Sequence, residues 1–329
     1  MTPRRVIIVV GLVGAAVALS ALLSRGGLRA RGGRGRSSGE LIVFHAGSLS
    51  VPFRELSALF EERHPGVRVR AEAAGSRDCA RKIADLGRRC DVLGSADYKV
   101  VENLLMPDFA DFNIRFATNE IGIAYTGRSR MSNGISPANW REILLRPEVT
   151  FGRSDPDSDP CGYRTAMVFQ LAEKHYGAPG LAARLEAKHG ARFMRPKETD
   201  LLALLEAGEV DYVFIYPSVA RQHGLKFLRL PDEVNLGSAD LAHVYKTAQV
   251  RVTGKKPGEF IARVGAPIVY SVTIPRNAPN AETAEAYVAL LLSAEGQRIM
   301  QSNGQAPIAP ARTGERDTVP ERLRPFLDQ

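Results

Sequence analysis

Carboxylates gather at one short turn of the chain. The stretch SDPDSDPCGYR, residues 154–164, places three aspartates beside two prolines, immediately before a segment with the apolar spacing of a helix. Asp159 followed by Pro160 is typical of a helix start, with the acid at the N-cap and proline at the first helical position. Glu198, in ETDLLALLEAG, falls in another first helical turn, where an acid complements the helix dipole. Capping therefore explains Asp159 without any ligand.

Two turns of similar design point to a different chemistry. In FHAGSL and EAAGSRD an apolar strand runs into Gly-Ser and then into a helix, with Ser48 and Ser76 as the serines. A helix start offers unpaired N–H groups and a partial positive charge, which favours anions. The alternative is that each serine only caps its helix. Because both turns are expected at the same edge of one parallel sheet, they predict an anion site. Neither has the spacing of a nucleotide-binding loop.

A cysteine and a histidine raise the possibility of an enzyme. Cys161 stands at a helix N-terminus, where a thiol can act as a nucleophile, and His45 could assist it. Against this, neighbouring Asp159 raises the pKa of the thiol, and a histidine that only hydrogen-bonds its own turn fits His45 better. We expect no catalysis, and we expect Cys79, Cys90 and Cys161, the only cysteines, to be free and mostly buried.

Arg164 follows these residues one turn into the helix and has two interpretations. It could neutralise Asp159 and keep that carboxylate ionised. Alternatively, it is a surface arginine paired with another acid.

Alternating strand and helix patterns provide the elements that must position these residues. Apolar runs and helix-period segments predict a βαβαβ unit, and hence a parallel sheet with helices on its faces, from the strands 40–45, 67–74 and 91–97 and the helices 51–66 and 77–89. A second α/β unit follows a strand that begins at Asn119. Two late helices, 281–293 and 294–304, have no sheet of their own and return to the first unit.

The chain therefore predicts two lobes with a ligand cleft between them. Lobe 1 is expected to comprise residues 40–118 plus 268–329, and lobe 2 residues 119–267. Two connections cross between the lobes, and closure is expected to hinge on the strands around 119–125 and 267–274.

The N-terminal residues 1–39 differ in composition from the rest. The run from Val6 to Leu23 carries no charge and reaches the roughly 17 residues needed to span a bilayer, which predicts a membrane anchor or, alternatively, a cleaved signal. A Gly/Arg-rich stretch, residues 24–39, predicts a flexible tether. The first 39 residues hold seven arginines and no acid, which leaves only +1 of the net charge of +8 for the remainder. The folded part therefore has no excess of basic charge for nucleic acid, and we expect it to be exported.

Several motifs together resemble one family. LIVFHAGSLSVPFRELSALFEERHPGV, EAAGS, DVLGSADY, SDPDSDPCGYR, DYVFIYPSVARQHGLKF and GAPIVYSVTIP occur in that order between about residue 40 and residue 307. They closely resemble the substrate-binding proteins of molybdate and tungstate ABC importers, in the branch that holds the metal of the oxyanion in six-fold coordination.

This resemblance implies a type II periplasmic-binding-protein fold and a role for each motif. The serines of HAGS and AAGS are Ser48 and Ser76, and the tyrosine of FIYPS is Tyr216; these are the expected oxyanion ligands. The aspartate before PCGYR is Asp159 and the acid of RPKETD is Glu198; these are the expected ligands of molybdenum or tungsten, with Asp200 as the rival of Glu198. Asp155 and Asp157 are expected to form the turn.

The implied chemistry resolves why an anion site would contain carboxylates. Hexavalent molybdenum and tungsten seek oxygen and can accept two more oxygen ligands, so carboxylates can bind the metal while hydroxyl and N–H groups hold the oxo groups. Sulfur and phosphorus cannot expand in this way, so sulfate and phosphate would meet uncompensated charge. The expected protein is an extracytoplasmic monomer that needs no cofactor and delivers its ligand to an ABC permease. A sulfate-binding protein, a Cys161-dependent enzyme and a sensor without a permease are the alternatives.

Overall fold

The structure, a computed structural model of the chain, describes residues 39–329, which lie within one compact unit, Ser37–Gln329. The predicted membrane-spanning run, residues 6–23, and all but the last residue of the predicted tether lie outside the described residues. The first described strand begins at Gly39, one residue before the predicted strand, and the Gly39 N–H donates to the Gly66 carbonyl oxygen at 3.0 Å. No helix in residues 39–329 is both long and apolar enough to cross a membrane.

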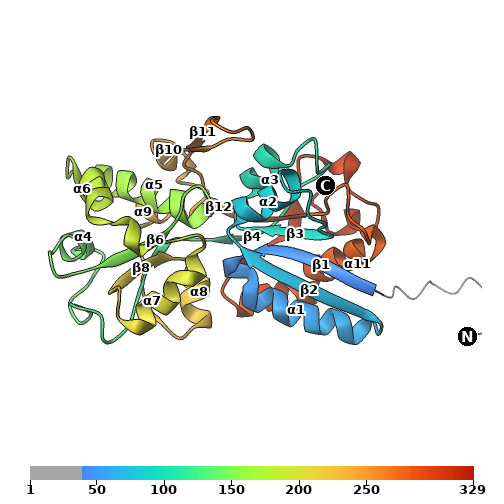
Figure 1. Cartoon of the computed structure of the whole chain (residues 1–329), viewed down its shortest axis with the longest axis horizontal. Helices are drawn as coiled ribbons and strands as arrows, with labels where there is room; N and C mark the ends of the chain where they lie inside the picture. The colour runs from blue at the N-terminus through green and yellow to red at the C-terminus, as the bar shows by residue number, and fades with distance from the viewer. Residues whose placement is uncertain (1–38) are drawn as a thin grey trace, which may run out of the picture. The chain divides into compact units, whose positions relative to one another are not determined.

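The first sheet is six-stranded and mixed (Figure 1). Its order is β13 (Ala306–Arg312), β4 (Ile114–Asn119), β12 (Ile268–Thr273), β3 (Val92–Ser95), β1 (Gly39–Ala46) and β2 (Val67–Ala74). The predicted parallel unit is present, because β1 pairs in parallel with both β2 and β3. Beyond this unit, β12 is antiparallel to β3 and β4, and β13 is antiparallel to β4, which makes the whole sheet mixed.

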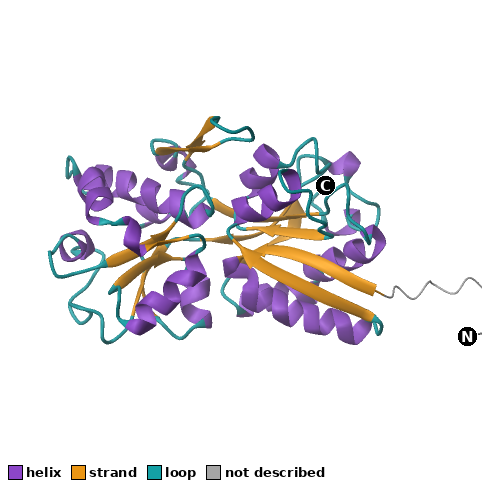
Figure 2. Ribbon diagram, in the orientation of Figure 1, coloured by secondary structure: helices purple, strands orange, loops and turns teal. Residues whose placement is uncertain are grey.

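Helices cover both faces of this sheet (Figure 2). Alternate residues of β1 pack on opposite sides: Leu41 and Val43 join the larger core, whereas Ile42 and Phe44 pack in a second cluster with residues of α2 and α3. Burial on both sides explains why this strand is a continuous apolar run. The helices associated with the sheet are α1 (Ser50–Arg63), α2 (Ser76–Ala84), α3 (Tyr98–Leu104), α11 (Ala281–Leu292) and α12 (Ala294–Ser302). As predicted, α11 and α12 return to the first unit, where both contact α1.

The second sheet has five short strands. Its order is β7 (Met194–Arg195), β6 (Phe151–Ser154), β8 (Tyr212–Ile215), β5 (Gly122–Tyr125) and β9 (Lys226–Leu228). Its helices are α4 (Trp140–Leu144), α5 (Pro160–His175), α6 (Leu181–Lys188), α7 (Leu201–Ala207), α8 (Pro217–Gln222), α9 (Asp232–Asn235) and α10 (Ala242–Tyr245). The functional candidates Asp159 and Tyr216 lie directly before α5 and α8, so this sheet positions both.

The chain passes between the two sheets twice. It leaves the first sheet through β4 and returns through β12, and these strands pair antiparallel, with Asn119 opposite Ile268. We propose that the two sheets mark two lobes, residues 40–118 plus 268–329 and residues 119–267. A separate hairpin, β10 (Gln249–Thr253) and β11 (Phe260–Val264), precedes the return.

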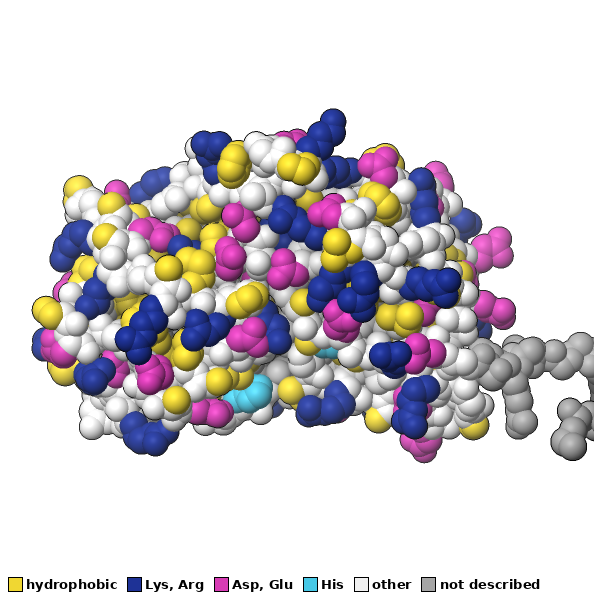
Figure 3. All heavy atoms as spheres, in the orientation of Figure 1, with side chains coloured by type: hydrophobic (Ala, Val, Ile, Leu, Met, Phe, Trp, Pro, Cys, Tyr) yellow, Lys and Arg dark blue, Asp and Glu magenta, His cyan; other side chains and the backbone are white. Residues whose placement is uncertain are grey.

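The strand expected to begin at Asn119 is divided in two. β4 ends at Asn119 in the first sheet and β5 begins at Gly122 in the second. Sequence reasoning missed β4 because its pattern runs directly into that of β5. On the face shown in Figure 3, basic and acidic side chains are interspersed, in keeping with the small net charge of the chain after its first 39 residues.

Candidate functional site

Asp159 is a buried helix cap with a second partner. It precedes α5, and its Oδ1 accepts from the Cys161 N–H at 3.3 Å, with Pro160 at the first helical position as predicted. Its Oδ2 accepts from the Glu198 N–H at 3.0 Å. The side chain is almost completely buried, and burial raises the pKa of the Asp159 carboxyl. Capping therefore holds Asp159 directly beside the second acid.

Glu198 is a fully buried acid whose carboxylate has no hydrogen-bond partner in residues 39–329. It opens a short 3₁₀ turn, Glu198–Asp200, ahead of α7. Burial, and then repulsion from Asp159, raise the pKa of Glu198 well above the ordinary carboxyl range. Leaving such a group unpaired is costly in a folded protein. By contrast, the rival Asp200 is partly exposed and pairs with Lys197 at 2.8 Å.

Ser48 lies at the end of β1 and does not cap a helix. The residue before α1 is Leu49, and no side chain provides a cap there. The Ser48 Oγ is buried and accepts from the Tyr270 hydroxyl at 2.9 Å. The preceding glycine brings this turn against the second acid, because a Cβ built on Gly47 would lie 3.0 Å from Oε2 of Glu198.

Ser76 occupies the equivalent place at the start of α2, and again its side chain makes no cap. Its buried Oγ accepts from the Ala96 N–H at 3.0 Å. The next two N–H groups, of Arg77 and Asp78, both donate to the Ser158 carbonyl oxygen, at 3.1 and 3.3 Å. The expectation that the start of α2 keeps its N–H groups for an anion is therefore wrong for these two, which instead hold the turn that carries Asp159.

Tyr216 follows β8, is fully buried, and accepts a hydrogen bond from Arg164 Nη1 at 2.8 Å. Burial raises the pKa of Tyr216 well above its usual value, so its hydroxyl keeps its proton. Arg164 itself is buried, and its ion pair is with Asp97 at 3.5 Å. Of the two interpretations of Arg164, the pairing with Asp159 is wrong and the pairing with another acid is right, but the arginine is not on the surface.

The three predicted hydroxyls share one property. Within the described residues, each accepts a hydrogen bond and none donates one to a protein group. We propose that one site combines the hydroxyls of Ser48, Ser76 and Tyr216 with the carboxylates of Asp159 and Glu198. Such a set can donate to the periphery of an anion and at the same time offer oxygen ligands to its centre.

The remaining candidates have structural roles. Asp155 accepts from the Asp157 N–H at 2.9 Å, as expected for a turn former. His45 contacts the Ala46 carbonyl oxygen at 2.8 Å through Nδ1, and burial lowers its pKa to about 4. All three cysteines are free and buried, as predicted. Burial, followed by repulsion from Asp159, raises the pKa of the Cys161 thiol, which removes the nucleophile that an enzyme would need.

Sequence reasoning missed several buried polar residues around the site. Ser154 ends β6 with an Oγ that has no partner in residues 39–329. Asp97 accepts from Tyr163 and from Arg263, the latter at 2.7 Å, and so joins the first sheet to α5 and to the β10–β11 hairpin. Their only sequence signal is position: Ser154 ends a strand, and Asp97 closes the motif GSAD.

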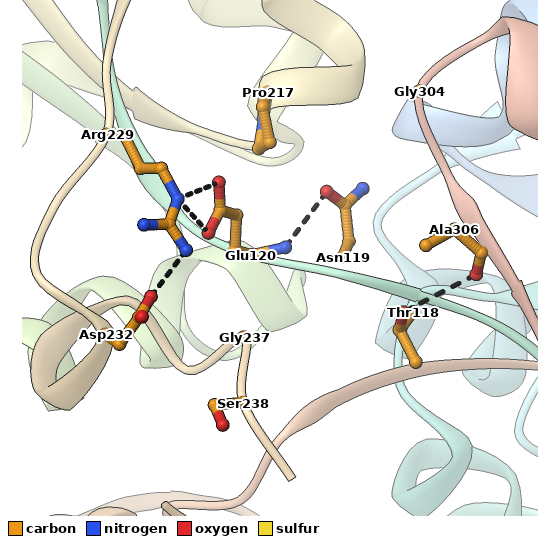
Figure 4. A pocket seen from close by; sticks show the side chains of 10 residues that line it. All are labelled: Thr118, Asn119, Glu120, Pro217, Arg229, Asp232, Gly237, Ser238, Gly304 and Ala306. Atoms are coloured by element: carbon orange, nitrogen blue, oxygen red, sulfur yellow. Dashed lines mark hydrogen bonds and ion pairs between the residues drawn. The ribbon is translucent and has the colours of Figure 1, made fainter.

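A pocket of about 340 Å³ lies beside the junction of β4 and β5 (Figure 4). None of the residues predicted from the sequence lines it. The charged side chains that line the pocket form ion pairs with one another. Arg229 Nε donates to both oxygens of Glu120, at 3.0 and 2.9 Å, and Arg229 also pairs with Asp232. Within residues 39–329, no group of three or more His, Cys, Asp or Glu side chains could hold a metal ion.

A side chain added at Gly75 should clash with its surroundings only when the two proposed lobes are closed. Its backbone (φ −59°, ψ 142°) suits alanine. However, a Cβ there would lie 2.2 Å from the Ser158 carbonyl oxygen and 2.9 Å from that of Pro196. We expect Gly75→Ala to weaken ligand binding at least tenfold, on the scale of about 1–3 kcal/mol for overpacking, and to leave the melting temperature of the ligand-free protein unchanged.

The control for this substitution is Gly127→Ala, where an added Cβ meets nothing within 4 Å. Calorimetric titration and thermal melts of both variants make the comparison. Wild-type affinity in Gly75→Ala would show that the Gly75 contact does not belong to the bound state.

Comparisons with known proteins identify the class. The fold is that of the type II periplasmic binding proteins: the periplasmic molybdate-binding protein of Azotobacter vinelandii matches with a TM-score of 0.59 at 16% identity, covering 81% of this chain and 98% of that one. The sulfate-binding protein SubI of Mycobacterium tuberculosis matches with a TM-score of 0.57 at 12% identity, covering 87% and 90%. At these identities the likeness shows the fold alone.

The chain belongs to the family of bacterial extracellular solute-binding proteins, whose model matches residues 41–305. Members of this family are transport binding proteins, so the enzyme alternative is wrong. A relative from Petrotoga mobilis, called an uncharacterized solute-binding protein, is 50% identical over 88% of this chain and 90% of its own. A protein of Thermococcus kodakarensis named molybdate/tungstate-binding protein WtpA is 40% identical over 97% of each chain.

Proposed function

We propose that this protein captures molybdate or tungstate outside the cytoplasm and delivers it to the permease of an ABC importer. The observation that carries the proposal is the buried Glu198 carboxylate, which has no hydrogen-bond partner in residues 39–329 and lies next to Asp159. A binding protein has no stability reason to keep this arrangement, because unpaired buried acids destabilise the fold. The name of the Thermococcus relative agrees with the proposed ligand.

The proposed division of labour follows from the donor and acceptor inventory. Asp159 and Glu198 ligate the hard, oxygen-seeking metal centre of the oxyanion and raise its coordination from four to six. Ser48, Ser76 and Tyr216 donate hydrogen bonds to the oxo groups, which carry the negative charge. The bonds to the metal offset the electrostatic repulsion between the dianion and the two carboxylates.

Rejection of sulfate follows from the same geometry. Sulfur in sulfate accepts no further oxygen ligands, so a bound sulfate would meet the two carboxylates without compensation. At an effective dielectric near 20, like charges about 4 Å apart repel by roughly 4 kcal/mol. The site therefore excludes the commoner anion by repulsion and not by size.

An anion panel tests this function. We expect calorimetric titration to show molybdate and tungstate binding at least about 100-fold more tightly than sulfate or phosphate, given a repulsion of several kcal/mol. Sulfate binding as tight as molybdate would reject the proposed ligand class and favour the sulfate alternative. No binding by any of the four anions would reject an oxyanion function.

We also propose that residues 6–23 anchor the protein to the membrane, that residues 24–39 act as the tether, and that the protein works as a monomer with its permease. The support is the uncharged apolar run and the Gly/Arg-rich composition that follows it. The mass of the mature protein decides between an anchor and a cleaved signal, and co-purification of a permease tests the partner.

A further inference from the structure

We propose that Asn119 and Tyr270 are positioning residues that aim the Ser48 hydroxyl hydrogen at the bound anion through a one-way hydrogen-bond chain. The chain runs from Asn119 Nδ2 to the Tyr270 hydroxyl at 3.1 Å, and from that hydroxyl to Ser48 Oγ at 2.9 Å. This inference rests on the proposed function, since it concerns the ligand of the same site.

The direction of the chain is set at its first member. The Asn119 Oδ1 accepts from the Glu120 N–H at 3.0 Å, which fixes the other end of the amide as the donor. An amide nitrogen only donates, so the Tyr270 oxygen must accept from it. The second hydrogen of the same amide goes to Ser218 Oγ at 2.8 Å. Asn119 therefore has both hydrogens committed, and turning the amide over would place its nitrogen against the Glu120 N–H, donor against donor.

The direction of the first hydrogen bond also fixes the direction of the second, from Tyr270 to Ser48. Tyr270 has one hydroxyl hydrogen, which it gives to Ser48 Oγ. Burial raises the pKa of Tyr270 above its usual value, so this hydrogen is retained. With its Oγ accepting from Tyr270, Ser48 is left to donate its own hydrogen. The nearest acceptor group on the protein is the Glu198 carboxylate, whose pKa the Ser48 hydroxyl lowers. An anion at the site supplies another acceptor.

The hydrogen-bond chain also lies where the two lobes are proposed to move relative to each other. Asn119 is the last residue of β4 and Tyr270 lies in β12, the two strands through which the chain passes between the sheets. Ser218, two residues beyond Tyr216, lies on the side of the second sheet. Asn119, Tyr270, Ser48 and Ser218 are all at most 8% exposed, so water does not substitute for these bonds. The same hydrogen-bond chain thus joins the two crossing strands to Ser48 on one side and to Ser218 on the other.

A double-mutant cycle with molybdate as the probe tests this inference. We expect Tyr270→Phe to weaken molybdate binding roughly tenfold, in line with the loss of one buried hydrogen bond. Ser48→Ala should weaken binding by at least as much. If Tyr270 acts through Ser48, the double variant should bind as Ser48→Ala does, with no further loss.

The matched control is Tyr287→Phe. Tyr287, in α11, is also fully buried, and its hydroxyl likewise contacts a serine, Ser57, at 3.0 Å. We expect it to lower the melting temperature about as much as Tyr270→Phe while leaving molybdate affinity within twofold. A purely structural role of Tyr270 predicts additive losses in the cycle, or an equal loss of affinity in the control, and either result overturns the inference.

A second cycle covers the case in which Tyr270→Phe does not fold. Asn119→Ala removes the first donor, so we expect a loss of roughly three- to tenfold in the wild-type background and none in the Ser48→Ala background. Additive losses overturn the inference here as well. Wild-type protein that binds no oxyanion at all would instead overturn the proposed function, and the inference with it, so the two failures are distinguishable.

Discussion

Glu198→Gln is expected to weaken molybdate binding by more than about 100-fold, the scale of losing a charged partner, while it raises the stability of the ligand-free protein. Glutamine keeps the shape of the side chain but is a neutral, poor ligand for a hexavalent metal. The Glu198 carboxylate has no hydrogen-bond partner in residues 39–329, and burial and Asp159 raise its pKa. The substitution that weakens binding therefore also removes a destabilising charge from the fold.

The opposite signs of the two effects make this prediction specific. A residue kept for packing would lose stability and affinity together, whereas a residue kept for binding costs stability. We expect the melting temperature of the ligand-free variant to rise by about 2–4 °C, corresponding to roughly 1 kcal/mol in a protein of this size. Sulfate should also bind more tightly than it does to the wild type, because one repulsive charge is gone. Asp159→Asn should act in the same direction on both anions.

The matched control is Asp200→Asn, which also removes one acid from the same 3₁₀ turn. Asp200 is partly exposed and paired with Lys197, so we expect molybdate affinity to stay within about threefold, as is usual for a surface ion pair. Calorimetric titrations and thermal melts of the two variants measure all of these effects. A large loss in Asp200→Asn with little change in Glu198→Gln would transfer the proposed ligand role to Asp200.

Asp97→Asn is expected to weaken binding by at least about 100-fold without touching the ligand, because breaking one partner of a buried ion cluster costs about 3–5 kcal/mol. Asp97 follows β3, whereas its partners Tyr163, Arg164 and Arg263 lie on α5 and on the hairpin. All four side chains are buried. Burial would raise the pKa of Asp97, but Arg263 and Arg164 outweigh it and lower the pKa to about 2, so the acid is ionised at neutral pH.

This cluster joins the two proposed lobes, so we expect it to stabilise their closed arrangement and not either lobe alone. We expect both arginines to regain water when the lobes open, so that the loss of the Asp97 charge then costs little. Asparagine is the right replacement because Asp97 also caps α3, accepting from the Lys99 N–H at 2.9 Å, and asparagine caps helices equally well. The expected result is therefore weaker binding with a nearly unchanged melting temperature of the ligand-free protein.

Asp108→Asn provides the control, since Asp108 also bridges the hairpin to the first lobe. It pairs with Lys255 at 3.0 Å, but its side chain is 62% exposed, and exposed pairs contribute little. We expect its affinity to remain within about threefold of the wild type. Small-angle scattering adds a second measurement: at a molybdate concentration that compacts the wild type, Asp97→Asn should stay extended. Equal affinity of Asp97→Asn and wild type would contradict a closing role for the cluster.

The local elements of this protein could be predicted from its sequence. The period of the apolar residues gave β1, α1, β2, α2 and β3 in the right order, and Asp159-Pro160 marked the start of α5. Those features depend on residues that are neighbours in the chain, so a contiguous pattern encodes them. The edge strands β7 and β13 did not follow, because β7 has only two residues and β13 contains two prolines, which weaken a strand pattern. The antiparallel pairing of β12 did not follow either, because the pattern within a strand does not encode the direction of its neighbours.

The sequence by itself determined which chemical groups this protein carries and the type of local structure that holds each one. Only the tertiary structure decided which of these groups meet: Asp97 with Arg263, 166 positions away, and Tyr270 with Ser48, 222 positions away. It also separated Glu198, which is buried and unpartnered within residues 39–329, from Asp200, which reaches solvent and Lys197. The physical reason is that burial and electrostatic environment depend on packing between distant segments, and two acids in one short turn look alike until that packing places them.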